Sequence, residues 1–473
     1  MDEYKHLPDL ERVAHGRPLP PELWQRQEQL VAQSRFLRKR LDAPVEGLVK
    51  MNQTSETTNR LVFFDNLRYL MILLVLIFHS GASYGSMVAF WPFHDANPTE
   101  LIDIIMILFD VFTMTILFFI AGYFSLPSLQ KKGGRRFLEG KFKRLGIPWL
   151  VVVVLVLPVL DYIHYYTQSV DSGLQPRGYA THWWLSMKSI AELRVGWMNM
   201  SEYLDMTEHF YQRYMWFLSL LLLFFVAFWL LYEVRKKWAK VSERSVREGT
   251  TSNRCIYVTL SLFGLLTVLL FASVKFFITS PDPSDMGWFS LGSLIQFQLA
   301  KLVLYAPYFG LGVYAYYRKW FANGKDFGRP WVWGLICFLL MVATMLVARS
   351  MSRAAEPSLG LQFAFAVLYP IWTLSFLGVF TAFSVRRWNR STPFNRELAA
   401  NSYNIYLVHY VFVMTLPLLL SNWSDGPVLV KFGIVALLTV LLSYGISRYM
   451  VKPYPRLVTI GLAGLSILLA VFT

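Results

Sequence analysis

The stretch Arg60-Leu-Val-Phe-Phe-Asp-Asn-Leu-Arg-Tyr-Leu-Met-Ile-Leu-Leu-Val-Leu-Ile-Phe-His79 decides the fold class. It is long and apolar enough for a membrane-spanning helix, yet it carries Asp65, Arg68 and His79. An isolated charge inside hydrocarbon costs at least about 2.5–3.5 kcal/mol. Arg68 and His79 would lie on one helix face about 16 Å apart, with Asp65 near the same stripe. The pattern predicts a transmembrane helix that presents a polar line to the interior of a helix bundle.

The composition supports a membrane protein. Of 473 residues, 55% are hydrophobic and only 16% are charged, whereas soluble domains have about 25% charged residues. Long uncharged runs recur, which predicts an all-α, polytopic integral membrane bundle rather than a barrel of short alternating strands. The net charge of +15 is concentrated in alternate loops, so no nucleic-acid partner is expected. The spacing of the two cysteines and the histidines predicts no metal site, and no permanently bound cofactor is expected.

The apolar runs predict ten core transmembrane helices plus a shorter eleventh. The ten lie near residues 62–87, 102–125, 146–166, 213–234, 255–279, 297–317, 330–349, 359–384, 400–421 and 429–449, and the eleventh is 457–473. We therefore divide the chain into a basic arm over 1–60, a ten-helix membrane domain over 61–450, and an additional helix over 451–473. Leucines at seven-residue spacing, Leu23, Leu30 and Leu37, predict an amphipathic helix in the arm.

Loop charges predict the orientation of these helices. Loops 126–145 and 235–254 each hold seven Lys or Arg residues, whereas loops 88–101, 280–296 and 422–428 hold none. Because basic loops stay on the cytoplasmic side, we expect a cytoplasmic N-terminus. Eleven spans would then place the C-terminus outside. The expected location is a bacterial cytoplasmic (inner) membrane, with the lipid bilayer as a partner.

A basic cluster connects the second and third spans. It consists of Lys131, Lys132, Arg135 and Arg136 around two glycines, followed by Lys141 and Arg144. Ammonium and guanidinium groups in such a loop can hold phosphates. The same charges can instead set the topology or contact anionic lipids. The residues alone leave these alternatives open.

A second group of polar and aromatic residues is a possible secondary site. In the ninth span, Tyr406 and His409 share a face, and Ser402 lies on an adjoining strip. Tyr123 lies near the end of the second span, and Trp216 opens the fourth. These side chains could take part in chemistry, but they could equally form polar and aromatic contacts between helices.

In order along the chain, these motifs resemble the membrane acyltransferase-3 family. The resemblance rests on Arg68-x10-His79, the Phe118-Phe-x-x-Gly-Tyr-Phe-Ser125 run, Arg144-Leu-Gly-Ile-Pro148, Trp216-Phe-Leu and Ser402-Tyr-x-Ile-Tyr-x-x-His409. It covers roughly residues 60–450. The stretch from Phe64 to Met71 looks most like the branch that includes periplasmic-glucan succinyltransferases.

The resemblance implies an O-acyltransferase. Members transfer an acyl group, acetyl or succinyl, from cytoplasmic acyl-CoA to a hydroxyl of an extracytoplasmic or lipid-linked glycan. His79 matches the family's essential histidine, as general base or acyl carrier. Arg68 matches its paired arginine and would hold a phosphate or the charge near the carbonyl, while Asp65 would pair with Arg68. The acyl-CoA site would comprise Lys131, Lys132, Arg135, Arg136, Lys141 and Arg144.

One position departs from the family pattern. The family commonly has Arg-x-x-Arg before the third span, where this chain has Lys141-Phe-Lys-Arg144. Lysine keeps the charge but loses the bidentate geometry of arginine, so the acyl donor is expected to bind differently in detail.

Two other functions remain open from the sequence. A secondary transporter of a glycan or acyl precursor would have a similar composition, although no partner of the first-span motif occurs in the second half, where an inverted repeat would place one. A bundle that has lost its chemistry is the other alternative. The acyl group, the acceptor and the oligomeric state are not predicted.

Overall fold

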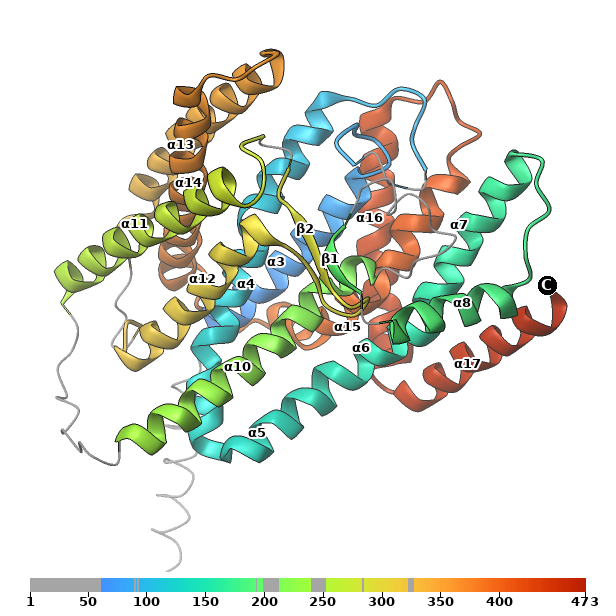
Figure 1. The fold of residues 1–473 in the computed structure, drawn as a ribbon. Coiled ribbons are helices and arrows are strands. Elements are labelled where there is room, and N and C mark those ends of the chain that lie inside the picture. The colour runs from blue at the N-terminus through green and yellow to red at the C-terminus, as the bar shows by residue number, and fades with distance from the viewer. Residues whose placement is uncertain are drawn as a thin grey trace, which may run out of the picture. The chain divides into compact units, whose positions relative to one another are not determined.

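The computed structural model describes residues 61–473 except for 89–90, 92, 193, 199–211, 240–251, 283–284 and 322–326. The predicted arm over residues 1–60 lies outside the described residues. The described part is a helical bundle with one small sheet (Figure 1), which confirms the all-α polytopic class.

Fourteen α-helices are described in this part of the chain. They are α3 (Val62–Gly81), α4 (Glu100–Lys132), α5 (Gly134–Lys141), α6 (Ile147–Val151), α7 (Leu157–Asp171), α8 (Tyr179–Ala191), α10 (Trp216–Ala239), α11 (Asn253–Phe277), α12 (Leu299–Tyr317), α13 (Pro330–Arg353), α14 (Leu359–Arg387), α15 (Pro393–Leu419), α16 (Val428–Ile446) and α17 (Pro455–Phe472). Ten helical runs in the described ranges are long and apolar enough to cross a membrane.

The ten candidate spans differ from the predicted spans at α12. This segment, predicted as a span, does form a helix, but it is not one of the ten. It contains five tyrosines and Lys301. The predicted eleventh helix, α17, is among the ten.

The third span begins earlier than the sequence suggested. A helical run extends from Gly134 to Asp171, with π-helical turns at Phe142–Gly146 and Val152–Val156. Each π turn comes just before a proline, Pro148 or Pro158. Because a π turn already interrupts the regular hydrogen-bond ladder, the missing N–H of proline does not end the helix here.

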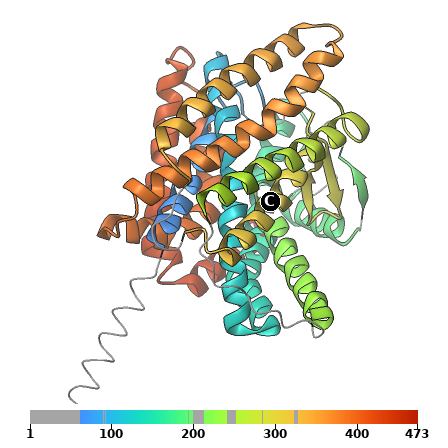
Figure 2. The same cartoon turned by 90° about the vertical axis from the view of Figure 1, so that its left-hand side faces the viewer.

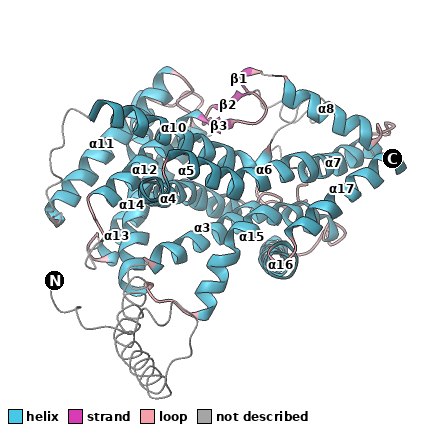
Figure 3. Ribbon diagram, turned by 90° about the horizontal axis from the view of Figure 1, so that it is seen from below, coloured by secondary structure: helices cyan, strands magenta, loops and turns pink. Residues whose placement is uncertain are grey.

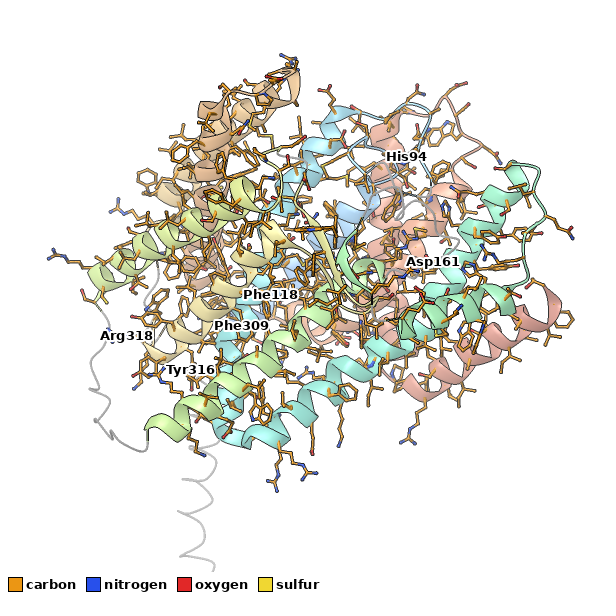
Figure 4. The ribbon with its side chains drawn as sticks, viewed as in Figure 1. His94, Phe118, Asp161, Phe309, Tyr316 and Arg318 are labelled. Carbon is orange, nitrogen blue, oxygen red and sulfur yellow. The ribbon has the colours of Figure 1, made fainter. Side chains whose placement is uncertain are left out.

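Helices α4 and α12 pack closely through two glycines. A Cβ atom on Gly122 would lie 2.0 Å from the carbonyl oxygen of Phe309, and one on Gly312 would lie 2.1 Å from that of Phe119. Phe118 and Phe309, one from each helix, are labelled in Figure 4. Small residues of this kind allow the backbones of membrane helices to approach each other.

We expect Gly122→Ala and Gly312→Ala to destabilise the protein by about 1–3 kcal/mol, because the added methyl must push two backbones apart. Gly310→Ala is the matched control on α12, since nothing lies within 4 Å of its new Cβ. Thermal unfolding in detergent measures the difference. Equal unfolding temperatures for Gly312→Ala and Gly310→Ala would contradict the close packing.

We call the end of the bundle at which α3 ends the histidine end, because His79 lies in the last turn of α3. Several connecting segments contact one another there. A three-stranded antiparallel sheet pairs β1 (Val195–Trp197) with β2 (Trp288–Leu291), and β2 with β3 (Gln296–Gln298). Loop 82–99 is tied to the first turn of α16 by an ion pair between Asp95 and Lys431. The pairing of β1 with β2 connects the predicted loops 167–212 and 280–296. The ion pair connects the predicted loop 88–101 to the start of the predicted span at 429–449, next to loop 422–428.

The opposite end, here the basic end, holds Lys131–Arg144 and the start of α3. There Asn66 donates to the carbonyl oxygen of Trp388 at 2.7 Å, and the Tyr69 hydroxyl donates to Oδ1 of Asn395 at 2.9 Å. These bonds fix the start of α3 against the connection between α14 and α15. Elsewhere α13 and α14 form a long hairpin (Figure 2), and α17 lies beside α8 (Figure 3).

Candidate active site at the histidine end

Helices α3 and α15 bring two histidines together. His79 lies in the last turn of α3 and His409 in the middle of α15. Nδ1 of His79 is 3.1 Å from Nε2 of His409. The His409 side chain is completely buried, whereas that of His79 is partly exposed. The pair therefore has one fully buried member and one partly exposed member.

The hydrogen-bond partners determine where the protons of a neutral pair lie. Nδ1 of His409 is 2.6 Å from the carbonyl oxygen of Tyr406, and a carbonyl can only accept. Nδ1 of His409 must therefore donate. Nε2 of the same ring then has a lone pair, which accepts a hydrogen bond from Nδ1–H of His79. Nε2 of His79 is then the unprotonated nitrogen. This is the arrangement that a general base or a nucleophile requires.

Aromatic rings surround the histidine pair. The Tyr214 ring packs parallel to that of Tyr410 at 4.4 Å between centroids and meets the His409 ring edge-on at 5.0 Å. The Trp91 ring lies nearly parallel to the His79 ring at 6.3 Å. The histidines are thus held in a mainly aromatic environment that restricts the orientations of both imidazoles.

Tyr214 is fixed by two hydrogen bonds to α15. Its hydroxyl donates to the carbonyl oxygen of Leu407 at 2.6 Å, and the Tyr406 hydroxyl donates to the Tyr214 carbonyl. The preceding residue, Arg213, has a φ of 51° and forms a buried ion pair with Asp161 at 3.2 Å. A left-handed conformation is unfavourable for arginine, so the ion pair and the hydrogen bonds must hold this turn in place.

Loop 82–99 positions Trp91 over His79. The indole N–H of Trp91 donates to Oγ of Ser83 at 2.9 Å, and the backbone N–H of Asp95 donates to the Ser83 carbonyl at 2.8 Å. Burial, and to a lesser extent the Asp95 carboxylate, raises the pKa of Tyr84 above its usual range. The Asp95–Lys431 pair is almost fully buried, with side chains 4% and 1% exposed.

Removing Lys431 should destabilise the protein and displace the Trp91 loop. Breaking a buried ion pair from one side typically costs about 3–5 kcal/mol, because the remaining charge stays buried and unpaired. We expect Lys431→Met to lower the unfolding temperature sharply and Asp95→Asn/Lys431→Met to lower it less. Thermal unfolding of the two variants provides the comparison, and a double variant no more stable than the single one would argue against the pairing.

The structure separates Asp65 and Arg68 from His79. Nη2 of Arg68 and Oδ1 of Asp65 form an ion pair at 3.0 Å near the basic end. Asp65 and His79 are fourteen positions apart on the helix, which corresponds to about 21 Å. Asp65 and Arg68 are therefore together, as the spacing suggested, but they do not lie beside the histidine pair.

The predicted donor-binding residues lie at the basic end. Lys141 is half-buried, with Nζ over the Phe225 ring at 3.9 Å from its centroid. The charges of Lys132 and Arg144 act on Lys141. The exposed members of the set are Lys131, Lys132, Arg135, Arg136 and Arg144. Arg135 is engaged by Glu139 at 3.0 Å.

Two residues of the possible secondary site belong to the histidine site. His409 is a member of the pair, and the Tyr406 carbonyl oxygen accepts from Nδ1 of His409. The other three have contacts elsewhere. Tyr123 packs on Phe64 at 4.7 Å, and Trp216 stacks on Tyr305 at 5.7 Å. The Ser402 hydroxyl donates to the carbonyl of Ala399 in its own helix.

The sequence interpretation missed several residues of this site. They are Trp91, Asp95, Asp161, Arg213, Tyr214, Tyr410 and Lys431. Lys431 and Asp161 lie within predicted spans, and an ionisable residue in a span is itself a signal. The aromatic residues carry no comparable signal, because aromatic side chains are abundant throughout this chain. Within the described ranges, no group of three His, Cys, Asp or Glu side chains is placed to hold a metal ion.

Together, the fold and the site define a polytopic membrane protein with a hydrogen-bonded histidine pair inside its helical bundle. Residues 61–448 match the sequence profile of the acyltransferase-3 family, described as an acyltransferase domain, so the chain belongs to this family. The chain is also 28% identical over 111 residues to glucans biosynthesis protein C of Escherichia coli (strain SMS-3-5 / SECEC). That similarity covers 23% of this chain and 28% of that protein. No solved structure matches.

Proposed function

We propose that this protein transfers an acetyl or succinyl group from acyl-CoA to a hydroxyl of an extracytoplasmic or lipid-linked glycan, with His79 as the reacting base or acyl carrier. The observation that carries the proposal is the hydrogen-bonded contact between His79 and His409. In a neutral pair, this contact leaves Nε2 of the partly exposed His79 free to accept a proton or an acyl group. Family membership supports an acyltransferase.

Two routes are consistent with this geometry. As a base, Nε2 of His79 takes the proton of the acceptor hydroxyl while its oxygen attacks the thioester carbonyl. The C–S bond then breaks, and the proton passes to the departing CoA thiolate. As a nucleophile, Nε2 attacks the carbonyl itself, releases CoA and carries the acyl group until the hydroxyl displaces it. In both routes His409 accepts from Nδ1–H of His79 and stabilises the positive charge that develops on this ring.

The donor is proposed to bind at the basic end. Phosphates of coenzyme A would contact Lys132, Lys141 and Arg144, and Arg68 would lie along the path to His79. From Arg68 to His79 the distance along α3 is about 16 Å. The long, flexible pantetheine arm of coenzyme A can extend through such a distance. The basic end would face the cytoplasm of a bacterium, with the histidine end on the outer side of the inner membrane.

The relative's name suggests a glucan as the acceptor. Glucans biosynthesis protein C shares only a short stretch with this chain, so the polymer and the choice between acetyl and succinyl are open to direct test.

Release of free thiol from acetyl-CoA and succinyl-CoA by purified protein tests the proposal. We expect His79→Ala to abolish release, because general-base assistance alone contributes about 10²–10⁴-fold. His409→Ala should reduce kcat by about 10–100-fold with little change in the KM for the donor, because Nδ1–H of His79 loses its acceptor. Donor-dependent thiol release that is unaffected by His79→Ala would contradict the assignment.

Mass spectrometry separates the two routes. An acylated peptide containing His79, trapped when donor is supplied without acceptor, would indicate the acyl carrier. Thiol release that occurs only when acceptor is present would indicate the general base.

We expect Arg144→Ala to raise the KM for acyl-CoA at least about tenfold, because it removes a charge-assisted contact to phosphate. Arg329→Ala is the charge-matched control, since Arg329 is an exposed cation at the start of α13. Initial rates at varied donor concentration give both values. Equal KM values for the two variants would remove Arg144 from the donor site.

A further inference from the structure

A pocket opens at the histidine end beside the candidate active site. It lies between loop 82–99, α7 and α15. Six of its nine lining side chains are apolar, Trp91 and Phe93 among them, and the three polar ones are His164, Thr167 and Thr415. Asp161, one turn before His164, marks the same part of α7 in Figure 4.

The pocket shares one wall with the histidine pair. Trp91 lines the pocket, and its ring also lies nearly parallel to that of His79 at 6.3 Å and edge-on to that of Tyr410 at 5.6 Å. A molecule in the pocket is therefore one side chain away from His79.

The opposite wall is also connected to the pair. His164 lies one turn after Asp161 on α7, and the charge of Arg213, which is paired with Asp161, acts on His164. Arg213 precedes Tyr214, whose ring contacts His409. The pocket and the histidine pair are thus built on the same rigid contacts.

The chemistry of the walls matches that of a sugar ring. A hexose has an apolar C–H face that suits an aromatic ring, and a rim of hydroxyls that needs donors and acceptors. Thr167 and Thr415 donate their hydroxyl protons to backbone carbonyls of their own helices, so their oxygens remain available as acceptors. A lipid chain would cover the apolar walls but would offer no hydrogen-bonding group to the His164 ring.

We propose that this pocket binds one sugar residue of the acceptor glycan, with Trp91 as the stacking surface and His164 and Thr167 as hydrogen-bonding groups. The inference rests on the proposed function, which supplies a glycan acceptor. It places the acceptor next to His79 at the end of the bundle opposite the proposed donor site.

Filling the pocket provides the test. Thr167→Trp introduces a large side chain into a pocket wall, and Gln168→Trp places the same side chain at the neighbouring exposed position, which is not one of the nine residues that line the pocket. With a glucan tetrasaccharide as acceptor, Thr167→Trp should raise the acceptor KM at least tenfold and leave the donor KM unchanged. Gln168→Trp should leave both unchanged. His164→Ala should also raise the acceptor KM.

Calorimetric binding of the same tetrasaccharide to the full chain in detergent, without donor, separates this inference from the proposed function. Binding that Thr167→Trp abolishes and Gln168→Trp retains supports the pocket even if no acyl transfer is seen. Transfer with an acceptor KM that Thr167→Trp does not change overturns the pocket but not the enzyme. A co-purified lipid lost only in Thr167→Trp, with unchanged acceptor KM, identifies a lipid site instead. Wild-type protein that does not bind the tetrasaccharide overturns the pocket, and the His79-dependent release of thiol from acyl-CoA then decides the proposed function separately.

Discussion

The contact between Nδ1 of His79 and Nε2 of His409 joins residues 330 positions apart in the chain, and the surrounding structure depends on it. In the hydrocarbon region of a bilayer, a polar side chain must find its hydrogen-bond partner inside the protein, because lipid chains cannot form hydrogen bonds and water is scarce there. Each histidine is the other's partner, and the Tyr406 carbonyl completes the chain of hydrogen bonds. The two contacts together determine that Nε2 of His79 is the imidazole nitrogen that remains free for chemistry.

Buried ion pairs extend this principle around the site. Asp95–Lys431 fixes the loop that carries Trp91, and Asp161–Arg213 fixes the turn that carries Tyr214. Buried pairs often add little net stability compared with apolar packing. Here each pair includes a residue close in sequence to an aromatic residue that contacts a histidine: Asp95 to Trp91, and Arg213 to Tyr214. We therefore interpret the two ion pairs as contacts that position the site.

Sequence periodicity predicted much of the fold because hydrocarbon imposes a strict rule on composition and length. It placed most of the long helices and identified His79 as an intramembrane histidine. It also predicted a span at α12, a helix whose Lys301 pairs with Asp110 of α4 and which packs against α4 through Gly122 and Gly312. It also missed that a π turn allows the third span to continue through Pro148.

The composition of the site was harder to predict, because it depends on the register between distant helices. Tyr406 and His409 were recognised as sharing a face, but nothing in the ninth span says that this face meets the end of α3. Trp91 and Tyr214 were missed because one lies in a loop and the other in a single 3₁₀ turn, where no periodicity applies. Conversely, Asp65 and Arg68 share a stripe with His79, yet about 21 Å of helix separates Asp65 from it. A shared stripe on a membrane helix therefore marks a path along the bundle, and its two ends can serve different substrates.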